Sequence, residues 1–138
     1  MYLQSGEPAR AKAVLEALCA MHPESAQGWF HLGEAERLLN QLPRASELYT
    51  KTIALDEHHV LARNNRGMIA RLEGRLEAAR ADFEAIVDGP RAEEKNALSA
   101  HLTLARCLVA LGRTQDAQSR YERYVRLGGR EPLAPAQR

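Results

Sequence analysis

A repeat of 34 residues constrains the fold of this chain more than any other feature of its sequence. An alanine recurs along the chain, each time with a large residue four positions later. The alanines are Ala11, Ala45, Ala79 and Ala117, at intervals of 34, 34 and 38 residues, and the large residues are Leu15, Tyr49, Phe83 and Tyr121. A period of this length is typical of a protein built by stacking similar structural units.

A third column keeps the same intervals and consists of residues that form turns. It lies five positions before each alanine and contains Gly6, Asn40, Gly74 and Gly112. After glycine, asparagine is the residue that best tolerates left-handed backbone just beyond a helix. The column therefore predicts that a helix ends before each of these positions.

The segments between these marks have helical periodicity, as in Trp29, Leu32, Gly33, Glu36 and Leu39. Alternating strand patterns and Asn-Gly or Asp-Gly hairpin signals are absent from the sequence. We predict an all-α chain. After a short start at 1–4, helices are expected near 8–21, 25–39, 43–56, 60–73, 76–88, 92–111 and 114–127.

The last interval is longer than the others by four residues, about one helical turn. The inserted stretch between Arg91 and Asn96 contains residues that favour helices. We expect it to lengthen the start of the helix that contains Leu102 and Leu104. Glu93, Glu94 and Lys95 would then begin this helix, because acidic residues favour the N-terminal end of a helix dipole.

The phased columns resemble the tetratricopeptide repeat (TPR) family, whose pattern is W-x2-L-G-x2-Y, then A-x3-F, then P. The second repeat carries the pattern best, with Trp29, Leu32, Gly33, Ala45 and Tyr49, although Glu36 replaces the aromatic residue. The first repeat keeps Tyr2, Leu15 and Pro23. The third repeat keeps Gly67 and Phe83, with Arg63 and Arg66 at the tryptophan and leucine positions. The fourth repeat keeps Leu104 and Tyr121, with His101 and Ala105 at the tryptophan and glycine positions.

The resemblance implies a right-handed superhelical solenoid of antiparallel helix pairs, each with a helix A and a helix B. It would cover residues 1–127 as a partial repeat 1–25 and complete repeats 26–59, 60–93 and 94–127, followed by a C-terminal tail at 128–138. Small residues at Gly33, Gly67 and Ala105 would let each helix A approach its helix B closely. The tail contains Pro132 and Pro135, so we expect it to form no capping helix.

In TPR proteins the helix A side chains line a concave groove that binds a partner. By position, the resemblance places the groove at Gln27, Phe30, Glu34, Arg37, Leu38, Asn64, Met68, Arg71, Leu72, Leu102, Arg106 and Val109. Three of these are arginines, which can form paired hydrogen bonds with carboxylates. The mixture suits a peptide of acidic character. Two alternatives remain open: the arginines form a solvated face, or Phe30 and Met68 pack between repeats.

Other classes of function are disfavoured by the composition. A net charge of +1 argues against a nucleic-acid partner. The sequence has neither a signal peptide nor a transmembrane segment, so the default compartment is the cytoplasm without membrane insertion. Cys19 and Cys107 are expected to be small buried hydrophobic residues. His58 and His59 are expected in a water-exposed turn without a metal, and His101 in packing. The sequence shows no catalytic site and implies no cofactor.

The function indicated is a non-catalytic protein-binding module that organises an assembly. One alternative is a docking or regulatory segment of a larger multidomain enzyme. Another is a scaffold that self-associates through open ends of the repeat array, giving a homo-oligomer. A strong preference for arginine over lysine, with only three lysines among 19 basic residues, suggests a GC-rich bacterial genome.

Overall fold

The computed structural model describes residues 7–134, so the predicted start at 1–4, Tyr2 and Gly6 lie outside the described residues. Within that range the chain has α-helices and no strand, which confirms the all-α prediction. The helices are α1 (Pro8–Met21), α2 (Ala26–Leu38), α3 (Leu42–Leu55), α4 (Val60–Leu72), α5 (Leu76–Val87), α6 (Leu98–Ala110) and α7 (Thr114–Arg126), with a short 3₁₀ helix η1 (Lys95–Ala97) before α6.

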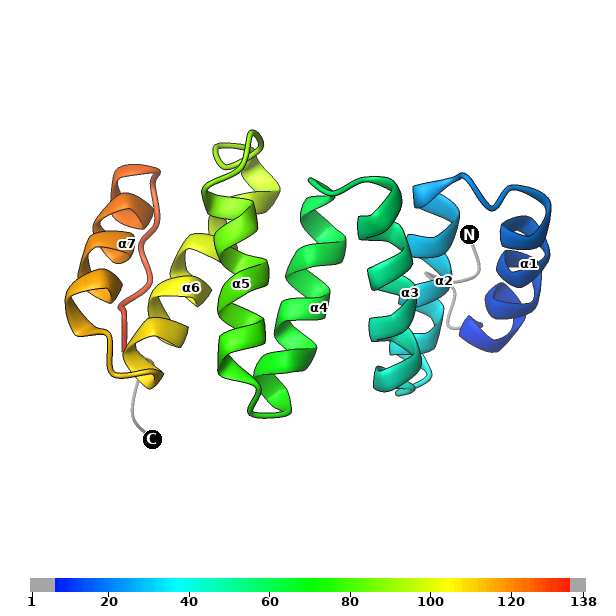
Figure 1. Cartoon of the computed structure of the whole chain (residues 1–138), viewed down its shortest axis with the longest axis horizontal. Helices are drawn as coiled ribbons and strands as arrows, with labels where there is room; N and C mark the ends of the chain where they lie inside the picture. The colour runs from blue at the N-terminus through cyan, green and yellow to red at the C-terminus, as the bar shows by residue number, and fades with distance from the viewer. Residues whose placement is uncertain (1–6, 135–138) are drawn as a thin grey trace. The chain divides into compact units, whose positions relative to one another are not determined.

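The chain forms two compact units, which we call the first unit (residues 1–66) and the second unit (residues 67–138). Helix α4 includes residues on both sides of this boundary. In the first unit α2 packs against both α1 and α3; in the second α6 packs against both α5 and α7. Figure 1 shows each pair of consecutive helices joined by a short connection. The expected two-helix hairpins are therefore present in both units.

Close helix approach explains the small residues of the repeat. A Cβ atom added at Gly33 would lie 2.8 Å from Tyr49 Cε1. A Cβ atom added at Gly67 would lie 2.9 Å from Phe83 Cζ. Both rings are fully buried. The aromatic side chain of helix B thus packs directly on the backbone of helix A, as the small columns predicted.

The turn column also has the predicted backbone. Asn40 has a φ of 60°, and Gly74 and Gly112 each have a φ of 78°. In each case the helix has ended one or two residues earlier. The left-handed residue reverses the chain into the next helix.

The four inserted residues do not lengthen α6, so that prediction is wrong. Residues 89–94 form turns, and the 3₁₀ helix at Lys95–Ala97 leads into α6 at Leu98. Glu94 precedes this 3₁₀ helix with extended backbone (φ −67°, ψ 148°). The loop is held by a side chain of α6: His101 Nε2 lies 2.8 Å from the Ala92 carbonyl oxygen. The insertion therefore builds a connection that folds back onto the helix.

Candidate functional site: the helix A faces and the C-terminal tail

The position that the family pattern fills with tryptophan has one structural role in all three complete repeats. Its side chain donates an N–H to a backbone carbonyl of the preceding connection. Trp29 Nε1 lies 2.8 Å from the Pro23 oxygen, and Arg63 Nε lies 2.7 Å from the Glu57 oxygen. His101 makes the equivalent contact with Ala92. Arg63 and His101 depart from the family pattern in sequence, but each makes the same kind of hydrogen bond as Trp29 does.

Phe30, predicted to line the groove, is only 5% exposed. Its ring centroid lies 4.8 Å from that of His59 and 6.0 Å from that of Tyr49. The structure thus gives Phe30 interior packing, which is the alternative that the sequence left open. It offers little area to a partner.

His59 is buried, so the expectation of a water-exposed His59 is wrong. Its Nδ1 accepts the Ala62 backbone N–H at 3.1 Å, which caps the start of α4. The other ring nitrogen therefore carries the proton and donates to Gln27 Oε1 at 2.9 Å. Gln27, another predicted groove residue, is exposed but joined to this cap.

Glu34 is the centre of a hydrogen-bond network on the helix A face of the first unit. Its carboxylate accepts from the Tyr49 hydroxyl, from Asn65 Nδ2 at 2.7 Å, and from Arg37 at 3.0 and 3.1 Å. Burial alone would raise the pKa of Glu34, but the bonds from Arg37, Tyr49 and Asn65 lower it below its usual value. Burial and the bond to Glu34 raise the pKa of the Tyr49 hydroxyl. Both groups keep their usual charge states at neutral pH.

The three groove arginines have different surroundings. The guanidinium of Arg37 is already paired with the carboxylate of Glu34. Arg106 donates to backbone carbonyls of the tail. Arg71 has no carboxylate partner among the residues that the structure describes. It is the arginine whose charge is uncommitted.

The remaining groove residues divide by exposure. Leu72 is 75% exposed and Leu38 is 47% exposed, and Val109 is also exposed. Asn64 and Met68 are half-buried, whereas Leu102 is buried in the core of the second unit. Among these residues, the exposed apolar side chains of Leu38, Leu72 and Val109 therefore lie at the end of their helices.

The tail folds back over α6 and α7 (Figure 1, red). Arg106 Nε donates to the Leu133 oxygen at 3.0 Å and Nη2 to the Pro132 oxygen at 2.9 Å. The Tyr121 hydroxyl donates to the Glu131 oxygen at 2.8 Å, and the Tyr124 hydroxyl accepts the Glu131 N–H at 3.3 Å. As expected, the tail contains no helix through residue 134. No motif in the sequence predicted that the tail would bind to Arg106 of α6.

The sequence argument also missed the role of Glu36. This side chain is only 3% exposed, with Lys12 Nζ at 3.3 Å and Arg44 Nε at 3.7 Å from its oxygens. Lys12 belongs to α1 and Arg44 to α3, so the acid ties three helices together. An acid at an aromatic position, with basic residues near the same level of both neighbouring helices, is a signal that could have suggested this pairing.

Other chemistry is not assembled in the described part of the chain. Residues 7–134 contain no group of three or more metal-ligating side chains. Cys19 and Cys107 are buried, as predicted, and burial raises the pKa of both thiols. No helix in that range is both long and apolar enough to cross a membrane.

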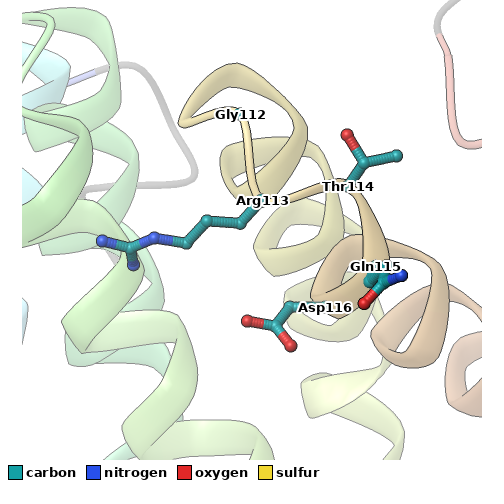
Figure 2. Close-up of a pocket in the computed structure, with 5 residues that line it drawn as sticks. All are labelled: Gly112, Arg113, Thr114, Gln115 and Asp116. Carbon is teal, nitrogen blue, oxygen red and sulfur yellow. The ribbon is translucent and has the colours of Figure 1, made fainter.

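A cavity of about 390 Å³ lies at the turn into α7. Figure 2 shows its lining residues, Gly112 to Asp116, with the Arg113 side chain extending away from the turn. Arg113 Nη2 lies 2.9 Å from Glu77 Oε1, so its charge is already paired. The cavity is formed by one short turn and offers no convergent set of functional groups.

Comparison with known proteins identifies the family. Models described as tetratricopeptide repeat match residues 2–57, 39–97 and 70–134. The chain belongs to the tetratricopeptide repeat family. No curated protein matches the sequence.

Solved structures have the same fold at low sequence identity. A crystal structure of MamA is 17% identical, covering 91% of this chain and 71% of that one, with a TM-score of 0.81. A structure of Pseudomonas aeruginosa pilF is 23% identical, covering 92% of this chain and 56% of that one, with a TM-score of 0.77. The APC/C hetero-tetramer Cut9-Hcn1 matches at 19% identity over 96% of this chain and 24% of that one, with a TM-score of 0.72.

Proposed function

We propose that this TPR chain is a non-catalytic protein-binding module, a scaffold that holds a segment of a partner protein against its helix A faces. The observation that carries the proposal is the end of α4, where exposed Leu72 adjoins Arg71, whose guanidinium has no carboxylate partner among the described residues. An apolar side chain and an uncommitted arginine together supply contact area and a charged anchor. The occurrence of the fold in the Cut9-Hcn1 hetero-tetramer supports a role in assemblies.

An acidic partner segment suits this surface best. Arg71 can form two parallel hydrogen bonds with a carboxylate. Arg37 is neutralised by Glu34, so it contributes less charge to a partner than the sequence alone indicated. We therefore assign the acidic contact to Arg71 and apolar contacts to Leu72 and Val109 in the second unit. Leu38 offers a similar apolar contact in the first unit.

The test compares two double variants of the whole chain. Arg71→Gln with Leu72→Ser alters the proposed surface. Arg126→Gln with Leu55→Ser makes the same chemical changes at exposed positions of α7 and α3. Proteins captured by the wild type are identified, and their acidic segments are titrated by calorimetry into all three chains. We expect the first variant to lose affinity by about tenfold or more, as when an interface anchor is removed.

The control variant should bind as the wild type does. Equal affinity in all three chains would contradict the proposed surface. Unchanged affinity for a segment whose acids have been replaced by amides would contradict the acidic contact while leaving the surface in place.

Self-association is a second candidate, favoured by a stripe of exposed apolar residues on α1. Val14, Leu18 and Met21 lie at helical spacing and are 47%, 42% and 69% exposed. Light scattering across a wide range of concentration tests it. A mass that rises with concentration in the wild type, and less in Leu18→Ser, would support it, whereas a constant monomer mass would contradict it.

A further inference from the structure

The tail is held by its backbone, and this is the observation from which we start. Three consecutive carbonyl oxygens, those of Glu131, Pro132 and Leu133, each accept a hydrogen bond from a side chain of α6 or α7. The Glu131 N–H donates to a third side chain, at the Tyr124 hydroxyl. We call Arg106, Tyr121 and Tyr124 the backbone clamp.

The clamp occupies a defined place in the repeat. Arg106 and Tyr121 lie 72 residues (34 + 38) after Glu34 and Tyr49, so the two pairs are equivalent positions of helix A and helix B. In the first unit that place is covered by α4, whose Asn65 side chain donates to Glu34. In the second unit it is covered by the tail. The tail therefore lies where the next helix A would pack.

The chemistry of Arg106 favours a non-helical occupant over a helical one. In a helix interior the backbone carbonyls are already bonded within the helix, so they offer little to an arginine. A segment outside a helix has carbonyls that are free of intrahelical bonds, and a proline such as Pro132 disfavours a helix. The tail is such a segment, with bends at residues 131 and 133. An arginine fork matches two successive free carbonyls.

The chain directs its own tail into this place. Gly128 has a φ of 102°, in the left-handed region. A Cβ atom added at Gly129 would lie 2.2 Å from the Tyr124 ring, so only glycine lets the backbone cross that ring. The glycine pair thus turns the chain sharply from α7 back along the clamp.

We propose that the backbone clamp is a binding site for a non-helical, proline-containing peptide, and that residues 131–133 occupy it as a tethered competitor. The proposal deepens the proposed function, because it names a second peptide site on this module and how it is kept closed. A tether of so few residues gives the tail an effective concentration of about millimolar or more. A free peptide must displace the tail before it binds.

The first experiment measures whether the tail is held in the full chain. Trypsin cleaves after Arg130, directly before the clamped residues, and release of the C-terminal peptide is followed by mass spectrometry. We expect Arg106→Gln to raise the cleavage rate by about tenfold, because two hydrogen bonds from a charged donor are lost. Arg126→Gln, an exposed arginine of α7, is the matched control and should not change the rate. Equal rates in all three chains would overturn the proposal.

The second experiment measures binding of a separate peptide, a fluorescent copy of residues 130–134, by anisotropy. In Gly129→Val the added side chain keeps the tail off the clamp, and we expect the peptide to bind about tenfold more tightly than to the wild type. Adding Arg106→Gln should abolish this gain. Pro132→Gly, which loosens the tail without touching the clamp, should give a smaller gain and covers the case in which Gly129→Val disturbs α7.

No gain in either tail variant, or a gain that survives Arg106→Gln, would overturn the proposal. These readouts need no natural partner. They can fail while Arg71 and Leu72 still bind an acidic segment, and they can succeed when that surface binds nothing.

Discussion

The α2–α3 hairpin and the α6–α7 hairpin place the same residue positions in opposite chemical roles. Position 34 is an acid that accepts from a helix covering it, and the equivalent position 106 is a base that donates to a non-helical tail. The tyrosine of helix B donates in both, to the acid in one and to a tail carbonyl in the other. The side chain at this position thus matches what the covering segment offers: an amide side chain from a helix, or free carbonyls from a non-helical segment.

The close approach of the two helices should be the feature of this comparison that is most sensitive to mutation. Gly33→Ala places a Cβ against the buried Tyr49 ring, and we expect it to lower the free energy of unfolding by about 1–3 kcal/mol through overpacking. Position 105 already carries an alanine, and Tyr121 is only half-buried. Urea unfolding measures the loss.

Gly28→Ala in the same helix is the matched control. Its added Cβ would meet nothing closer than 3.6 Å. It should stabilise α2 by about 0.5–1 kcal/mol, because glycine is a poor helix former. Similar changes for the two substitutions would show that helix propensity, and not the Tyr49 contact, governs position 33.

Removing the tyrosine hydroxyl should have the next largest effect, and the loss of stability should differ between the two hairpins. Tyr49→Phe leaves the half-buried carboxylate of Glu34 with one donor fewer, and we expect a loss of about 2 kcal/mol, typical of a hydrogen bond to a charged group. Tyr121→Phe removes a partly exposed bond to the tail and should cost less than about 0.5 kcal/mol. Urea unfolding of both variants measures the difference, and equal losses would contradict the different burial of the two sites.

The acid at position 34 should also make the stability of the first hairpin sensitive to acid. The folded-state pKa of Glu34 lies below the usual glutamate value of 4.5. Its contribution to stability is therefore present above that pH and is lost as the pH falls through the folded pKa. Between pH 6 and pH 3, Glu34→Gln should lose less stability than the wild type does. Glu47→Gln, at an exposed acid, should follow the wild type.

Sequence reasoning predicted the parts of the fold that depend on local spacing. The alanine, aromatic and turn columns predicted the hairpins, the left-handed residues and the close contact at Gly33 and Gly67 correctly. Each of these depends on a residue type whose size or backbone freedom is visible in the sequence. The buried thiols followed from the same reasoning.

What could not be predicted depends on contacts between segments far apart in the chain. The residues 91–96 favour a helix locally, but the His101 bond to Ala92 and the turn after Pro90 hold them as a loop. Arg106 resembled a groove arginine, and nothing in its neighbours showed that its partners would be carbonyls 26 and 27 residues later. The groove prediction named Phe30 from its position alone, whereas its burial depends on His59.

The smallest effect at neutral pH concerns His101, which replaces Trp29 at the equivalent position of the second unit. Burial lowers the pKa of His101, and the nearby charges of Arg123 and Arg120 lower it further, against the opposing effect of the Ala92 bond. The neutral ring is thus the stable form. The unfolded chain binds a proton more readily, so stability is full above about pH 6.5 and falls as the pH drops through the folded pKa.

His101→Gln keeps a donor for the Ala92 carbonyl but cannot titrate, so its midpoint of urea unfolding should change less between pH 8 and pH 5.5 than that of the wild type. His22→Gln, at an exposed histidine, should retain the wild-type dependence. A wild-type slope in His101→Gln would mean that the loop over α6 is held without this ring, and that the insertion, unlike the tail, has its own stable structure.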